Sequence, residues 1–217
     1  MFWGLVAFVG LCVLIGIAAL FIKDKSTQQV FIQLLCVDAP FLQRAIRDIA
    51  VSGDADQPGE LERMFLKAVE ATLNSRSHWA YGRADLTFGS FMEMAMDLEN
   101  RAVLARAAFT SETTKNQQDG VLTGPTFSPS TARPDEGAAL YFALTLGAVL
   151  DTTRLQLKAT PNKMPIRAEH IEELLRALLH TEGRGLLRVQ VVWSPDVAGE
   201  FLTEEQAIRK YPDLGKL

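Results

Sequence analysis

Apolar positions recur along this chain with two periods, close to two residues in some segments and close to 3.6 in others. Residues 30–37, VFIQLLCV, predict a strand whose inward face carries Val30, Ile32, Leu34 and Cys36. A helix follows directly, with Asp38 placed to cap it and Gly53 just past its end. The apolar stripe of that helix consists of Phe41, Leu42, Ala45, Ile46 and Ile49.

A second helix is predicted to begin near Pro58, because the apolar residues beyond it follow helical spacing. These residues are Leu61, Met64, Phe65, Ala68, Val69 and Thr72. A third helix falls within residues 87–100. The pattern of residues 101–113 fits either a continuation of that helix or a strand, and we predict a strand.

Two further strands are predicted on either side of a fourth helix. Residues 138–150 are apolar on both faces, as a covered central strand would be, and the run is short for the alternative of a second membrane crossing. Residues 186–193 alternate into another strand. The helix between them ends at Gly183, and its stripe consists of Ile171, Leu174, Leu175, Leu178 and Leu179. The connection has the length of a crossover, which predicts parallel strands.

These elements predict one soluble domain over residues 26–217. Its class is α/β or α+β, with a mixed sheet of about four strands packed by about four to five helices. Residues 115–137, which contain three prolines, interrupt the compact pattern as a long loop. The loop is either a surface loop or an arm that contacts a partner through Leu122 and Phe127.

The first segment, residues 1–25, predicts a single transmembrane helix with a basic flank. Residues 2–22 carry no charge and would span roughly 31 Å as a helix, which matches one bilayer core. A cleaved signal peptide would begin with basic residues and have a shorter apolar core, so we favour an uncleaved anchor. Lys23 and Lys25 place the N-terminus outside and the domain in the cytoplasm. Within this segment Trp3 and Gly10 are candidate contacts to a partner helix or the interface.

Composition narrows the class of partner. The net charge of −4 and the pI near 5.5 argue against binding of nucleic acid, which requires a concentrated basic surface. Two cysteines, Cys12 and Cys36, are too few for a disulfide framework.

Candidate chemistry is sparse. His170 and Glu173 have helical spacing that could share a metal, but no further ligand completes a set. Met92, Met94 and Met96 do not share a helical face and are interpreted as core packing rather than a copper site. Neither dinucleotide nor phosphate-binding glycine motifs occur. We therefore predict no metal, no cofactor and no catalytic residues, and expect the protein not to be an enzyme.

An aromatic stretch at residues 75–83 offers a candidate interaction surface. Trp79 and Tyr81 follow the second predicted helix and either plug the edge of the core or anchor a partner, since such residues dominate interface hot spots.

The C-terminal end of the chain carries a structural signature. Trp193 closes the last long strand, and Pro195 stops its ladder because proline has no N–H. Thr203 and Gln206 fit a capping box that starts a short helix. Pro212 ends this helix, with Tyr211 free to pack on the domain.

The sequence LLRVQVVWSPD followed by LTEEQAIRKYPDLGKL resembles the C-terminal signature of the family called domain of unknown function 1517. The matching residues are Trp193, Ser194, Pro195, Leu202, Glu204, Glu205, Tyr211 and Pro212. More loosely, NSRSHWAYG and YFALTLGAVL are similar to upstream family segments, so the resemblance covers residues 28–217. It implies a membrane-linked protein, often of photosynthetic organisms, and brings no catalytic residues.

Together these features predict a non-catalytic, single-pass accessory or scaffold subunit. Its partners would be the lipid bilayer and other subunits of a photosynthetic or respiratory membrane complex. One alternative is a membrane-tethered enzyme or small-ligand-binding domain. A second alternative is a transient assembly or regulatory factor.

Overall fold

A computed structural model describes residues 27–54, 56–107, 138–154, 156–157 and 166–217. Along the chain its elements are β1 (Thr27–Val37), α2 (Pro40–Ser52), α3 (Glu60–Asn74), the 3-10 turn η1 (Arg76–His78), β2 (Trp79–Gly89), α4 (Phe91–Ala107), β3 (Tyr141–Asp151), α5 (Ala168–Leu179), β4 (Leu186–Ser194), α6 (Glu204–Lys210) and β5 (Gly215–Lys216). The predicted anchor, residues 1–25, and the predicted loop, residues 115–137, lie outside the described residues. Among the helices that are described, none combines the length and the apolar character needed to cross a membrane.

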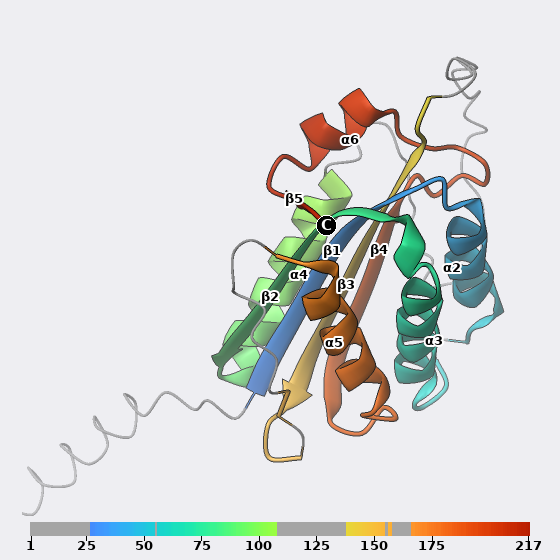
Figure 1. Cartoon of the computed structure of the whole chain (residues 1–217). Coiled ribbons are helices and arrows are strands. Elements are labelled where there is room, and N and C mark those ends of the chain that lie inside the picture. Colours follow the sequence, from blue (N-terminus) through green and yellow to red (C-terminus); the bar gives the residue numbers. More distant parts are fainter. Residues whose placement is uncertain (1–26, 55, 108–137, 155, 158–165) are drawn as a thin grey trace, which may run out of the picture.

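The strands form one five-stranded sheet in the order β4-β3-β1-β2-β5 (Figure 1). Every pairing within it is antiparallel. The fold is therefore α+β, and the predicted mixed sheet with a parallel pair is wrong. Asp151 at the end of β3 donates its N–H to Gly185 O just before β4, so β3 ends where β4 begins. The length of a connection could not reveal this, because a connection that contains one helix can cross the sheet once or twice.

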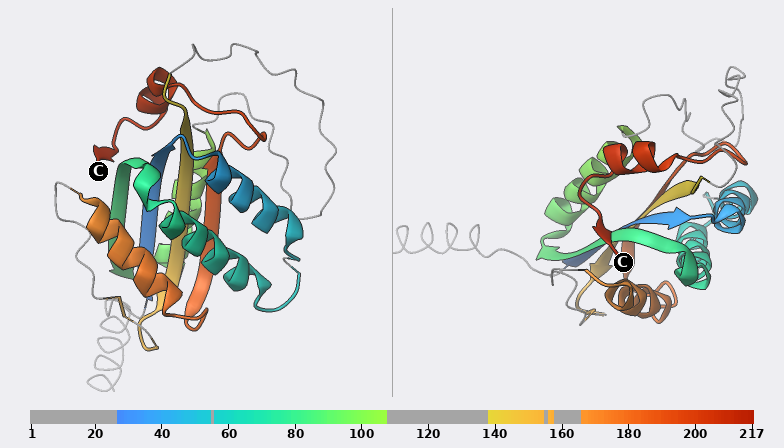
Figure 2. Two further views of the ribbon diagram at one scale, coloured as in Figure 1. Left: turned by 45° about the vertical axis from the view of Figure 1, so that its right-hand side comes forward. Right: turned by 45° about the horizontal axis from the view of Figure 1, so that its top comes forward.

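Helices α2, α3 and α5 cover one face of the sheet, and α4 lies on the other, with the short α6 at one end of that second face (Figure 2). Alternation along β1 explains the two layers, since side chains of successive residues point to opposite faces. The face predicted from the sequence, with Val30, Ile32, Leu34 and Cys36, is confirmed as part of the main core beneath the three helices. Phe31 faces the other way and packs with Leu98 of α4.

A glycine lets α4 approach its face of the sheet closely. Gly147 lies in the middle of β3, and a Cβ atom at this position would come within 2.3 Å of Leu98 Cδ1. The buried residues of α4 are Ala95, Leu98, Ala102 and Ala105, mostly small side chains at helical spacing. This spacing continues to Ala107, so the strand predicted over residues 101–113 is wrong for the part that the structure describes.

The sequence pattern missed or misplaced three other local features. Strand β2 went unpredicted because Gly82 and Ala84 occupy positions of its inward face where larger residues would reveal the alternation. The third predicted helix begins only after this strand, at Phe91. Asp38 does not cap α2: it adopts φ 49°, and its carboxylate accepts a hydrogen bond from Leu140 N at 3.2 Å.

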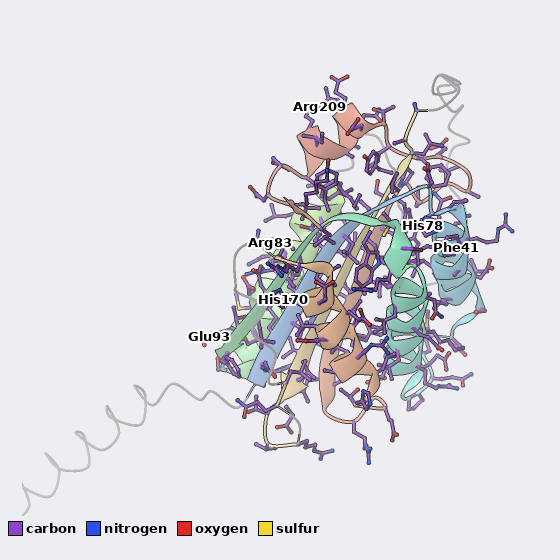
Figure 3. The ribbon with its side chains drawn as sticks, viewed as in Figure 1. Phe41, His78, Arg83, Glu93, His170 and Arg209 are labelled. Carbon is purple, nitrogen blue, oxygen red and sulfur yellow. The ribbon has the colours of Figure 1, made fainter. Side chains whose placement is uncertain are left out.

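Some residues of the predicted apolar stripes are exposed in the structure. Phe41 and Leu61 are 46% and 49% exposed rather than buried. Phe41 instead meets the ring of His78 edge-on, with centroids 5.0 Å apart, as Figure 3 shows. Met92 and Met96 are exposed as well, so the predicted methionine core is reduced to Met94, which packs from α4 against Phe31 and Val149 of the sheet.

Candidate functional site

The chain after β4 crosses one end of the sheet and returns at its opposite edge (Figure 1). We call residues 195–217 the C-terminal strap. Leu202 and Tyr141 exchange backbone hydrogen bonds of 2.8 Å, which fix the middle of the strap to the start of β3. Gly215 then pairs with Gly82 of β2, and Leu217 N donates to Ala80 O at 3.0 Å. The strap therefore links the two edges of the sheet.

A buried side chain of α2 organises the first part of the strap. Gln43 is 2% exposed, and its Nε2 donates to the carbonyl oxygens of Pro195, Val197 and Glu200 at 3.1, 3.1 and 2.8 Å. Its Oε1 accepts from Gly199 N at 3.0 Å. Buried backbone groups need hydrogen-bond partners, and this loop has no strand pairing to supply them. The amide of Gln43 provides a partner for four of these groups.

The short helix α6 forms the second part of the strap. The predicted capping box is confirmed: Thr203 Oγ1 accepts from Gln206 N at 3.3 Å, and Gln206 Oε1 accepts from Thr203 N at 3.0 Å. The predicted end is confirmed too, because α6 stops at Lys210 and Tyr211 is 8% exposed in a core cluster. Burial raises the pKa of the neighbouring Tyr141 hydroxyl, and the charge of Glu204 raises it further.

The start of the strap also agrees with the predicted end of the strand before Pro195. Strand β4 ends at Ser194, one residue before Pro195, and the bond between them is cis. Trp193 packs against the main core, and its buried Nε1 lacks a hydrogen-bond partner among the described residues.

A cleft of about 420 Å³ opens between the end of the strap, α4 and the sheet. We call it the strap cleft. Its floor is Phe31 and Gln33 of β1, and its walls include Arg101 and Leu104 of α4. The strap contributes Lys210, Tyr211, Pro212, Asp213 and Leu214. Two residues of the C-terminal signature, Tyr211 and Pro212, therefore line a concave surface.

Paired charges dominate the wall opposite the strap. Asp85 Oδ2 accepts from Arg101 Nη1 at 2.7 Å and lies 3.0 Å from Arg83 Nη2. The Nε of Arg101 donates to Asp97 at 2.7 Å. Burial alone would lower the pKa of Arg101, but the hydrogen bonds and charges of Asp85 and Asp97 outweigh it and raise that pKa. The guanidinium also stands 5.0 Å from the ring centroid of Phe31.

This arrangement suits binding of a small amphipathic molecule or a peptide side chain more than acid–base chemistry. Asp85 already neutralises two arginines, and Arg101 is held charged. Polar groups beside apolar side chains, here Phe31 and Leu104, are the usual make-up of a ligand pocket. Within the described ranges, no group of three or more His, Cys, Asp or Glu side chains is placed to hold a metal ion.

The residues predicted as partner contacts differ in burial, and some of them lie outside the described residues. Trp79 is 7% exposed and donates its indole N–H to Thr72 O at 3.2 Å, which fits the core interpretation. Tyr81 is partly exposed, with its ring 6.3 Å from that of Tyr141. Trp3, Gly10, Leu122 and Phe127 lie outside the described residues, and their partner contacts stay predictions.

Two elements of the site were missed by sequence reasoning. The sequence pattern could have revealed Gln43. It is a polar residue on the inward face of α2, four positions after Ala39 and three before Ile46. The cluster of Asp85, Arg83 and Arg101 had no usable signal, since it joins β2 and α4 only through the packing of the helix on the sheet.

Comparisons with known proteins agree with the signature. The family described as "Protein of unknown function (DUF1517)" matches residues 26–217. A similar protein is "Protein FLAP1 homolog A" of Synechocystis sp., which is 27% identical over 206 residues. The match covers 92% of this chain and 59% of that protein, so the chain spans less than two thirds of its relative's length. No solved structure matches the chain.

Proposed function

This chain belongs to the DUF1517 family, and we propose that it is a non-catalytic, single-pass accessory subunit of a larger membrane protein complex. Its N-terminal helix joins the complex within the bilayer, and its cytoplasmic domain packs on the other subunits. The N-terminus lies on the outer side of a cytoplasmic or photosynthetic membrane.

One observation carries this proposal: the uncharged residues 2–22 end only four residues before β1 begins at Thr27. Four residues extend over at most about 14 Å, so a helix at residues 2–22 in a bilayer would hold the domain close to the membrane surface. A domain held there meets membrane proteins more often than soluble ones. The family resemblance of the C-terminal signature suggests a photosynthetic or respiratory membrane as the setting.

Membrane extraction of the full chain tests the anchor. Leu11→Arg places a charge in the middle of the segment, at a cost of about 2.5–3.5 kcal/mol for insertion, and should release the protein from membranes washed with alkaline carbonate. The matched control is Ile208→Arg on α6, where the side chain is 50% exposed, and this variant should stay bound. Retention of the Leu11→Arg variant would contradict the anchor.

A native gel of mild-detergent extracts, followed by mass spectrometry, tests the complex. The protein should migrate with other subunits in constant proportion. Migration as a lone monomer under every detergent condition would contradict the accessory role. Recovery with a partner in small and variable proportion would favour the alternative of a transient assembly or regulatory factor.

The strap cleft supports a second candidate function, a small-ligand-binding domain tethered to the membrane. A volume of about 420 Å³ is within the range of small-molecule sites. Leu104→Trp should fill the cleft, because Leu104 lines it and is 69% exposed. Val103→Trp, at the preceding position and 51% exposed, is the control outside the cleft. A metabolite that raises the Tm of the wild-type chain and of the control, but not of Leu104→Trp, would establish this function.

A further inference from the structure

Exposed apolar side chains surround the end of the sheet at which β1 begins. Phe88 lies one residue before the end of β2, and its side chain is 40% exposed. Phe91 and Met92 are the first two residues of α4, and they are 45% and 67% exposed. Leu187, the second residue of β4, is 46% exposed. We call these four residues the tether-end residues. They come from two strands and one helix, β2, β4 and α4.

The four residues are distributed around the sheet rather than on one side of it. Phe88 shares its face of β2 with Leu86 and Ala84, which pack under α2, α3 and α5, whereas Phe91 and Met92 belong to α4 on the opposite face. Leu187 lies on β4, at the far edge of the sheet from β2. A flat partner protein would contact one of these sides, whereas a plane across the end of the strands would contact all of them.

The backbone places this end next to the predicted anchor. Thr27 pairs with Gly89, and Thr27 Oγ1 donates to Gly89 O at 2.9 Å. Ile22, the last residue of the uncharged segment, is five residues before Thr27, a distance of at most about 18 Å along an extended chain. The opposite end of β1, at Val37, is roughly 33 Å further away. Only the end with the tether-end residues is held near the bilayer.

From this arrangement we infer that the tether-end residues rest in the interfacial layer of the same membrane that holds the anchor. The occupant is the lipid surface, and the inference rests on the membrane anchor of the proposed function. Phenylalanine, leucine and methionine side chains suit the boundary between headgroups and acyl chains. In Figure 3, Glu93 marks this end of the domain and Arg209 marks the opposite end.

Charges at this end contribute little to the contact. Arg154 lies 3.7 Å from Asp151, and Arg184 lies 3.0 Å from Glu182, so each exposed arginine has an acidic neighbour. Glu93 is turned back onto its own helix start, where its Oε2 accepts from Ser90 N at 3.1 Å. The contact of the tether-end residues themselves should therefore depend on apolar insertion.

Lipid-borne quenchers test the inference on the full chain. A single cysteine is introduced as Met92→Cys in a Cys12→Ser background and labelled with an environment-sensitive fluorophore. Cys36 does not interfere, because it is fully buried and burial raises the pKa of its thiol to about 12. The control is Ile208→Cys on α6, which is also exposed but lies at the opposite end. The chains are reconstituted in phosphatidylcholine vesicles with and without a nitroxide-labelled lipid.

The label at position 92 should shift to shorter wavelength and lose most of its emission to the nitroxide lipid, whereas the label at 208 should do neither. Equal quenching at both positions, or none at 92 in a chain that resists carbonate extraction, would overturn the lipid contact while leaving the anchor intact. The second result, combined with crosslinking of position 92 to a protein in native membranes, would assign the surface to a partner subunit. Loss of the chain from the vesicles would instead overturn the proposed function.

Discussion

The two ends of the sheet are closed in opposite ways. At the strap end, buried polar groups such as Gln43 satisfy the backbone of a crossing segment, and Tyr211 fills the core beneath it. At the tether end, the turn from β2 into α4 leaves Phe91 and Met92 exposed. The strap end exposes Val197 and Ile208 on its outer surface, whereas the tether end exposes four apolar side chains around the ends of the strands. The inferred lipid contact rests on that arrangement.

The largest effect should follow from breaking the strap end at Gln43. Gln43→Met keeps the volume but removes the partners of four backbone groups, which should lower the free energy of unfolding by about 3 kcal/mol. Gln33→Met is the matched control, because Gln33 makes one side-chain hydrogen bond of 3.2 Å and should cost less than about 1 kcal/mol. Chemical denaturation of both variants measures the difference, and equal losses would contradict the role given to Gln43.

The next effect concerns Cys36, which lies in β1 towards the strap end. The pKa of its thiol is raised by burial from 9.0 to about 12, so the folded state keeps the thiol neutral while the unfolded state ionises. The stabilisation is complete below pH 9 and is lost as the pH rises from 9 towards 12. Denaturation in that pH window should show a decline that Cys36→Ala lacks.

Thiol alkylation at pH 8 sharpens the same contrast between the ends. In a Cys12→Ser background, Cys36 should react only as fast as the domain unfolds, whereas a cysteine introduced by Met92→Cys should react at once. Rapid reaction of Cys36 would show that the core at the strap end opens locally.

Each end carries one capping box, and these allow a closer comparison. Thr203→Ala at the strap end and Ser90→Ala at the tether end should each cost about 1 kcal/mol. Their local consequences should differ, because α6 has seven residues and α4 has seventeen on the sheet. Hydrogen exchange should speed up throughout α6 in the first variant and only in the first turn of α4 in the second. Unchanged stability of Thr203→Ala would contradict the cap.

The smallest effect on stability is expected from the tether-end residues themselves. Phe91→Ser combined with Met92→Ser should change the free energy of unfolding by no more than about 0.5 kcal/mol, since both side chains are largely exposed. Thermal unfolding in detergent measures this change. A loss of several kcal/mol would mean that these residues serve the fold and not a contact outside it.

The periodicity of apolar residues predicted an element correctly where that element buries one of its own faces. The inward face of β1, the stripe of α5 and the cap of α6 were all predicted, because each depends on neighbours along the chain. The same pattern gave a wrong prediction, or none, where the structure depends on how two elements pack together. Small residues on β2 hid a strand, and the antiparallel direction of β4 depends on where the preceding connection leaves the chain.

The candidate site divides in the same way. Tyr211 and Pro212 were recognised as a signature, but the cleft that they line needs α4 and β1 on its other sides. Asp85 and Arg101 are 16 residues apart and meet only because α4 folds back across β2. No local pattern encodes such a pair.

By itself the sequence determined the uncharged segment at residues 2–22, the main helical and strand segments, and the family signature, because each is a property of adjacent or periodically spaced residues. The tertiary structure decided the strand directions, the burial of Gln43 and the gathering of exposed apolar residues around the start of β1. These features depend on contacts between residues far apart in the chain, and such contacts exist only once the sheet has formed.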